Sequence, residues 1–388
     1  MKTNSKSLTA LVYNTNTIAQ KNLYQVMKEK KKKSLHPRSY STSSNQKNNP
    51  KDQSEAVFHS NQFTISNLPV ECHPQIDTIL SATGRLSKAL NIQLEKDSYA
   101  AHTNMTAYLY PKSEIYRIVL VNVFYDLLYY IDDIFGEDIQ GFDIAEQPNL
   151  QEVMSIWFTG NINEDYYQSI KSPRIKSICT AVQWTRTKIS QSCEPEFFDT
   201  LSNALFEHLK EQLQPEPYTD LSSYIKLRRK FSGMYVVIHL IEYCYRCYLT
   251  KNILEKVPSL QVVIDKCADI SGLGNDVISY PKEKHSKLNL INVLLDLKVV
   301  QSFNEAIQTS IDLVNKLHLE VDEAITKTKI EIQALDNESR TTVLRFIEGI
   351  NSILSASYHW QLVTQRYRHE DHILVDLRAD LNYKGDAA

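Results

Sequence analysis

Glycine is scarce in this chain, accounting for only 9 of 388 residues, far below the roughly 7% of an average protein. Tight turns between strands use glycine wherever the backbone φ angle is positive. The scarcity therefore argues against a sheet protein rich in turns and favours long helices joined by polar loops. Hydrophobic residues make up 42% of the chain and charged residues 23%, which suits a globular protein with a sizeable core.

Long apolar runs and a cysteine framework are also missing. The longest apolar candidate, 115–131, is interrupted by Arg117, Asn122 and Asp126, so a membrane span is not expected. The six cysteines are scattered and no secretory signal precedes them, which does not indicate a disulfide framework. Cys244 and Cys247 form a single CxxC, which without a second pair indicates buried thiols rather than a zinc or redox site.

The amino-terminal region differs from the rest of the chain. Its first 55 residues carry 11 Lys and Arg against 3 Asp and Glu, whereas the whole chain has a net charge of −3. Low hydrophobicity with excess charge of one sign is typical of disorder. We therefore expect a disordered basic leader over residues 1–62 and a helical domain over 63–388. We expect a cytoplasmic protein, with organelle targeting by the leader as the alternative, no nucleic-acid partner, and an oligomeric state left open, a homodimer being one option.

Apolar residues spaced three and four apart predict helices in the remainder of the chain. The segment 114–133 is apolar almost all round, which indicates a buried helix. We expect an all-α fold of about ten to twelve helices around one core. The other strongest helical runs are 221–249, 260–277, 288–317 and 341–367.

The first candidate site is a carboxylate cluster at the end of the buried helix 114–133. It contains Asp132, Asp133 and Glu137. Such a cluster is costly unless a cation neutralises it, and oxygen ligands suit Mg²⁺. The alternative is a helix end that runs into a solvated acidic loop, which Gly136 would also allow.

The second candidate site is a row of oxygen donors within 275–283. Asn275, Ser279 and Glu283 stand four residues apart, so they share one face of a helix at steps of about 6 Å. An amide, a hydroxyl and a carboxylate in a row can chelate a hard cation. The alternative is an ordinary polar stripe on a surface helix. Pro281 should kink the helix between Ser279 and Glu283.

Both motifs resemble the metal-binding pair of class I terpene synthases (terpene cyclases) of the single-domain microbial type. The first resembles the aspartate-rich motif in its DDxxxE form, and the second matches NDxxSxxxE. The resemblance implies the helical bundle of this family around a central active-site cavity. It also implies three Mg²⁺ ions that hold the substrate diphosphate, with these metal ligands: Asp132, Asn275, Ser279 and Glu283.

The first motif departs from the common DDxxD form, because Gly136 occupies its fifth position. This leaves open whether Asp133, Glu137 or Asp138 supplies a metal ligand. Asp276 lies about 100° away from the row of donors on a helix, so we expect it to support the fold instead.

The resemblance also assigns residues to the diphosphate. In the family an arginine 46 positions before the Asn of the second motif senses this group, and Arg229 stands at that distance from Asn275. Ser232 would be the linker and Gly233 the helix-break residue whose carbonyl faces the substrate.

Three further residues match positions of the family that contact diphosphate: Lys282, Arg366 and Tyr367. Tyr129, one turn before Asp132, would face the cavity and stabilise a carbocation, with plain core packing as the equal alternative.

The predicted function is the Mg²⁺-dependent ionisation and cyclisation of an isoprenyl diphosphate, with release of diphosphate, by a carbon–oxygen lyase. Farnesyl diphosphate is the first choice and geranylgeranyl diphosphate a close second, so the product would be a sesquiterpene or a diterpene. One alternative is a prenyl chain-elongating synthase, although that class uses aspartate-rich motifs at both sites. The other is a catalytically silent helical protein that binds isoprenyl diphosphate.

Overall fold

The computed structural model describes residues 56–92, 104–135, 147–213 and 215–378. Within these ranges the chain forms helices and loops but no β-strand, and the prediction of an all-α fold is confirmed. Ten of the helices in the described part have eleven residues or more. The described helices include none that is long and apolar enough to cross a membrane.

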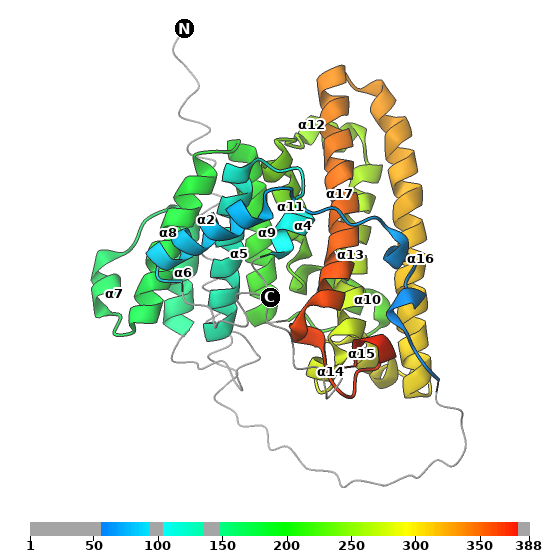
Figure 1. Cartoon of the computed structure of the whole chain (residues 1–388). Coiled ribbons are helices and arrows are strands. Elements are labelled where there is room, and N and C mark those ends of the chain that lie inside the picture. Colours follow the sequence, from blue (N-terminus) through cyan, green and yellow to red (C-terminus); the bar gives the residue numbers. More distant parts are fainter. Residues whose placement is uncertain (1–55, 93–103, 136–146, 214, 379–388) are drawn as a thin grey trace.

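One group of helices gathers around α5 (Figure 1). Helix α5 packs against α2 and α8, and α6 lies on α8. The apolar residues of α5 are buried on nearly every side of the helix, as the sequence predicts. The long helices of this group are α2 (Ile76–Ala89), α5 (Ile115–Phe135), α6 (Gln147–Thr159) and α8 (Pro173–Ser190). Helix α9 (Pro195–Leu213) contacts α8 but packs mainly against α10 and α11, so it connects this group to the second one.

The second group of helices is organised around α13, which packs most extensively against α16 and also contacts α17, α10 and α11. Helices α16 and α17 run antiparallel at one side of the bundle (Figure 1), and each packs against α13. The long helices of this group are α10 (Leu221–Phe231), α11 (Met234–Tyr245), α13 (Ser259–Ile278), α16 (Phe303–Glu331) and α17 (Asn337–Val363).

Short helices connect these elements. They are α4 (Met105–Leu109), α7 (Glu164–Ser169), α12 (Lys251–Lys256), α14 (Tyr280–Glu283) and α15 (Leu290–Asp296). Two long runs that the sequence predicts as helical are each divided in the structure. The run 221–249 breaks at Gly233, whose φ is 70°. The run 288–317 is split because Ser302 starts α16 with its own capping box.

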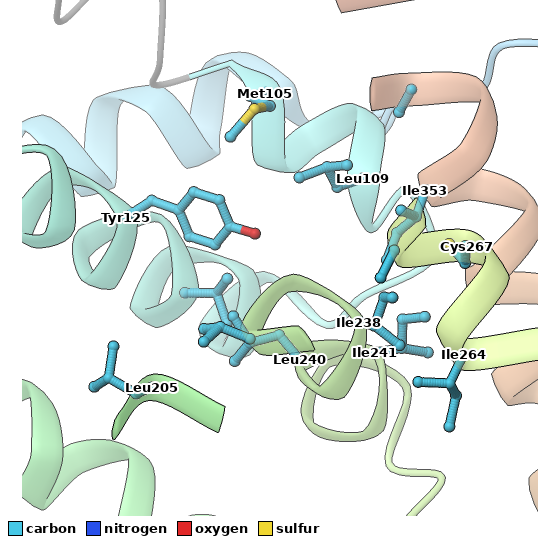
Figure 2. Close-up of a cluster of buried hydrophobic side chains, with 14 of the residues drawn as sticks. Met105, Leu109, Tyr125, Leu205, Ile238, Leu240, Ile241, Ile264, Cys267 and Ile353 are labelled. Atoms are coloured by element: carbon cyan, nitrogen blue, oxygen red, sulfur yellow. The ribbon is translucent and has the colours of Figure 1, made fainter. Parts of the chain in front are cut away.

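The two groups meet in one hydrophobic core. Figure 2 shows buried side chains that several helices contribute to it, including Tyr125 of α5, Leu205 of α9 and Ile353 of α17. Helices α11 and α17 approach closely because α17 carries a glycine, Gly349, at their contact. A Cβ atom at this position would lie 2.3 Å from Cγ2 of Ile241, so only glycine fits. Cys244 and Cys247 are buried free thiols, as predicted.

An amino-terminal strap, residues 57–68, runs across α16 and α17 (blue in Figure 1). Phe58 is buried, and its carbonyl accepts a hydrogen bond of 2.9 Å from the Val375 N–H. The Ser60 N–H donates to Oδ1 of Asp376 at 3.0 Å. The folded part therefore begins before the predicted leader boundary at residue 62, because these contacts fix the strap to the carboxyl-terminal segment. Residues 1–55 of the predicted leader lie outside the described residues.

Candidate active site

The row of oxygen donors predicted at 275–283 spans the junction of α13 and α14. Pro281 has no N–H to donate to the carbonyl four residues earlier, and α13 ends at Ile278. The helical register nevertheless continues. The Ser279 N–H donates to the Asn275 carbonyl at 2.7 Å, and the Glu283 N–H donates to the Ser279 carbonyl at 3.1 Å. The three donors therefore keep their four-residue spacing on one stripe.

The donor atoms of this stripe fit a hard cation. Oγ of Ser279 donates its hydrogen to the Asn275 carbonyl at 2.7 Å, which leaves the oxygen lone pairs to accept. Oε2 of Glu283 accepts from Nδ2 of Asn289 at 3.2 Å, and Glu283 is half-buried. The described residues contain no group of three or more His, Cys, Asp or Glu side chains that could hold a metal. An amide, a hydroxyl and a carboxylate are instead the oxygen donors that Mg²⁺ accepts.

The first motif is described only through the backbone of its start. Helix α5 continues through Asp132 and Asp133, but their side chains lie outside what the structure describes. Glu137 and Asp138 lie outside it altogether. The metal roles of these residues, and the hollow expected between Asp132 and the second motif, stay predictions.

Comparison with known proteins gives the family. The family model "Terpene synthase family 2, C-terminal metal binding" matches residues 124–320, about half of the chain. This chain belongs to the terpene synthase family. It is a class I terpene synthase, a lyase-type enzyme with a divalent-metal site that acts on an isoprenyl diphosphate.

Sequence relatives of this synthase are distant. The sesquiterpene synthase Agr3 of Cyclocybe aegerita is 24% identical over 69% of this chain and 75% of its own length. The 4-epi-cubebol synthase ((2E,6E)-farnesyl diphosphate cyclizing) of Streptosporangium roseum is 23% identical over 71% of this chain and 80% of its own.

A solved structure, germacradien-4-ol synthase from Streptomyces citricolor, has the same fold as this synthase. The TM-score is 0.65 at 16% identity, and the match covers 78% of this chain and 99% of that one.

Asp276 supports the fold of the synthase, as the sequence predicts. Its Oδ1 accepts from Nε and Nη2 of Arg228, each at 2.8 Å, and its Oδ2 accepts from the Tyr224 hydroxyl at 2.6 Å and from the Leu290 N–H at 3.0 Å. Burial raises the pKa of Asp276 to about 6, against the lowering influence of Arg228. The Arg228 guanidinium and the two further donors stabilise this group as a carboxylate, which ties α10, α13 and α15 together.

Arg229, the predicted diphosphate sensor, pairs with two carboxylates of α13 rather than with the row of donors. Its Nε and Nη2 donate to the two carboxylate oxygens of Asp269 at 2.7 and 2.8 Å, and its Nη1 donates to Asp265 at 2.6 Å. The preceding residue, Arg228, contacts the metal stripe instead, since its Nη2 lies 3.3 Å from Oδ1 of Asn275. The sequence analysis missed the contact of Arg228 with Asn275. It also missed that Asp265 and Asp269, one turn apart on α13, form an acidic face that binds Arg229.

The helix break at Gly233 lies where the family resemblance places it. Its φ of 70° is left-handed, and a Cβ atom would lie 3.2 Å from the His208 ring. Oγ of Ser232 donates to the Arg229 carbonyl at 3.0 Å and accepts from the Met234 N–H at 3.3 Å. Ser232 thus stabilises the break, and the left-handed backbone angle favours glycine there.

The carboxyl-terminal pair lies beside the second motif. The Tyr367 hydroxyl oxygen accepts from Nδ2 of Asn275 at 3.2 Å, and the Trp360 ring stands edge-on to Tyr367 with centroids 6.2 Å apart. Arg366, which precedes Tyr367, and Lys282, which precedes Glu283, are both exposed. The structure therefore brings Tyr367 to the metal stripe, while its diphosphate role stays a prediction.

Two amide side chains that the sequence analysis missed hold the predicted ligands. Gln361 contacts Asn275, and Asn289 contacts Glu283. No spacing rule could have found them, because one lies on another helix and the other in a loop. Tyr129 is half-buried on α5 and packs against the core, which agrees with either of its predicted roles.

Proposed function

We propose that this synthase uses Mg²⁺ to ionise an isoprenyl diphosphate and cyclises the resulting cation. Farnesyl diphosphate, which would give a sesquiterpene, is the first choice, and geranylgeranyl diphosphate, which would give a diterpene, is the alternative. The observation that carries the proposal is the unbroken register of Asn275, Ser279 and Glu283 across the junction of α13 and α14. The names of the relatives support a 15-carbon substrate, since one is a sesquiterpene synthase and another cyclises farnesyl diphosphate.

The metal ligands in this proposal are Asp132, Asn275, Ser279 and Glu283, with three ions in total. When bound, Mg²⁺ supplies positive charge that stabilises the departing diphosphate. Each of the three donors on α13 and α14 offers an oxygen lone pair, and Asn289 restrains the carboxylate of Glu283.

Cationic and phenolic side chains complete the diphosphate site in this proposal. Arg366 and Lys282 stabilise the charge that develops on the leaving group, and Tyr367 donates its hydroxyl hydrogen. Arg229 joins them only by exchanging one of its carboxylate partners for the diphosphate. The apolar walls of the bundle exclude water, which would otherwise capture the cation as an alcohol.

The test is product analysis by gas chromatography with mass spectrometry after incubation with Mg²⁺ and each diphosphate in turn. Asn275→Ala and Asp132→Ala should lose turnover by several orders of magnitude while circular dichroism still reports native helix. Asn315→Ala is the matched control, because Asn315 of α16 binds the amino-terminal strap through Gln62 and Thr64. It should keep full turnover.

Several outcomes would contradict the proposal. Full activity of either alanine variant, or activity that survives EDTA, would refute the metal assignment. A longer linear prenyl diphosphate as product would identify a chain-elongating synthase. Intact binding of diphosphate with no product from either substrate would identify a silent binding protein.

A further inference from the structure

Gln361 links α17 to the predicted metal-ligand row on α13. It lies in the last turn of α17 and is only 7% exposed. Its Oε1 accepts from Nδ2 of Asn275 at 2.8 Å, and its Nε2 donates to the Ser357 carbonyl at 2.6 Å. We infer that Gln361 is a positioning residue that turns the Asn275 amide so that its oxygen, not its nitrogen, faces the metal site. The inference rests on the proposed role of Asn275 as a metal ligand.

The orientation follows from the fixed polarity of the two ends of a hydrogen-bond chain. At one end the Ser357 carbonyl can only accept, so Gln361 must turn its NH₂ group toward it and its oxygen toward Asn275. At the other end the guanidinium of Arg228 can only donate, and its Nη2 meets Oδ1 of Asn275 at 3.3 Å. A flipped Asn275 amide would place NH₂ against the guanidinium and oxygen against oxygen. Both contacts are repulsive, so the chain selects one orientation.

Tyr367 strengthens this selection. The NH₂ group of Asn275 has two hydrogens, and the structure gives each an acceptor, Oε1 of Gln361 and the hydroxyl oxygen of Tyr367. Since the Tyr367 oxygen accepts from Asn275, its own hydrogen points elsewhere and can be donated to diphosphate. The same amide therefore orients the metal ligand and the phenol.

The expected size of the effect comes from other metal sites. Removing a hydrogen-bond partner that orients a ligand typically weakens metal affinity about 10–100-fold. A metal cannot bind the NH₂ group of an amide. If the Asn275 side chain is free to flip, only the molecules whose amide oxygen faces the metal site can bind the ion. Gln361 is uncharged, so replacing it with methionine changes the ligand orientation without removing a cationic group.

The experiment measures the dissociation constant of Mg²⁺ in the presence of inorganic diphosphate by isothermal titration calorimetry. Gln361→Met removes the acceptor and should raise this constant at least about tenfold. Gln361→Glu keeps an oxygen acceptor for Asn275 but loses the donor to the Ser357 carbonyl, so it should bind Mg²⁺ more tightly than Gln361→Met and less tightly than the unmodified protein. The Mg²⁺ concentration for half-maximal turnover should shift in the same order.

Ser355→Ala is the matched control. Ser355 is a buried residue on the same helix, and its hydroxyl donates a hydrogen bond of 2.8 Å to the Pro69 carbonyl rather than to the Asn275 amide. It should lower the melting temperature without changing the Mg²⁺ constant. If Gln361→Met does not fold, Gln361→Ala replaces it. A water molecule that takes the place of the amide can donate or accept, so it no longer selects the orientation.

The outcomes separate this inference from the proposed function. If Gln361→Met binds Mg²⁺ as tightly as Ser355→Ala, or if Gln361→Glu is as weak as Gln361→Met, Gln361 has only a structural role and the inference is overturned. If Asn275→Ala itself binds Mg²⁺ and diphosphate normally, the metal assignment fails first. Weaker Mg²⁺ binding by Asn275→Ala and Gln361→Met, with tighter binding by Gln361→Glu than by Gln361→Met, supports both the metal assignment and the role of Gln361.

Discussion

Asp126 should make the stability of this protein fall as the pH rises. It is a buried carboxyl group on α5, 1% exposed, whose Oδ2 accepts from Oγ of Ser87 at 2.7 Å. Its Oδ1 has no hydrogen-bond partner within the described part of the chain. Burial raises its pKa to about 7, partly opposed by the Ser87 hydroxyl.

The direction of this change in stability with pH follows from comparing the pKa of Asp126 in the folded and unfolded chains. Because the folded pKa of Asp126 lies above its unfolded value, the unfolded chain releases the proton first as pH rises from about 4 to 7, and ionisation then favours unfolding. A shift of about three pKa units corresponds to about 4 kcal/mol between the protonated and ionised limits. Between pH 5 and 8 the expected loss is about 2–3 kcal/mol.

Asp126→Asn tests this reasoning, because asparagine keeps an acceptor for Ser87 but carries no charge. Its new NH₂ group lacks an acceptor and costs about 1–3 kcal/mol at every pH. The free energy of unfolding of the variant relative to the original protein should therefore rise by about 2–3 kcal/mol from pH 5 to pH 8. Urea unfolding followed by circular dichroism measures this difference.

A matched control removes a charge elsewhere. Asp312→Asn changes an exposed carboxylate on α16 and corrects for the general effect of one less negative charge. If the relative stability of Asp126→Asn is the same at pH 5 and pH 8, or moves as it does in the control, the burial argument is wrong.

The remaining predictions concern the helix break, the buried ion pair and the leader. Gly233→Ala should cost at least about 1–2 kcal/mol of unfolding free energy because of its positive φ; an unchanged urea midpoint would contradict this. Arg228→Met should cost about 3–5 kcal/mol, since it leaves the buried carboxylate of Asp276 without its cation; a loss below 1 kcal/mol, the size of a surface pair, would count against a buried role. Deleting residues 1–55 should leave product formation and the melting temperature unchanged, and a folded but inactive truncation would show that the leader takes part in catalysis.

Local sequence pattern was enough to predict the helical class and the two motifs. The scarcity of glycine and the apolar spacing in 114–133 depend only on backbone geometry within one helix. The same holds for Asn275, Ser279 and Glu283, because their four-residue spacing survives the Pro281 break through hydrogen bonds between near neighbours. Asp276 could be placed off the donor row for the same reason, by its angle on the helix.

The sequence by itself determined the all-α class, the family and the order of the candidate ligands along the chain. Only the tertiary structure decided that Arg228, not Arg229, meets Asn275, and that Gln361 supplies its acceptor. Adjacent residues on α10 point about 100° apart, so the rotation of α10 against α13 selects the arginine. That rotation, like the approach of α17, is set by packing among helices distant in sequence, and no spacing along the chain encodes it.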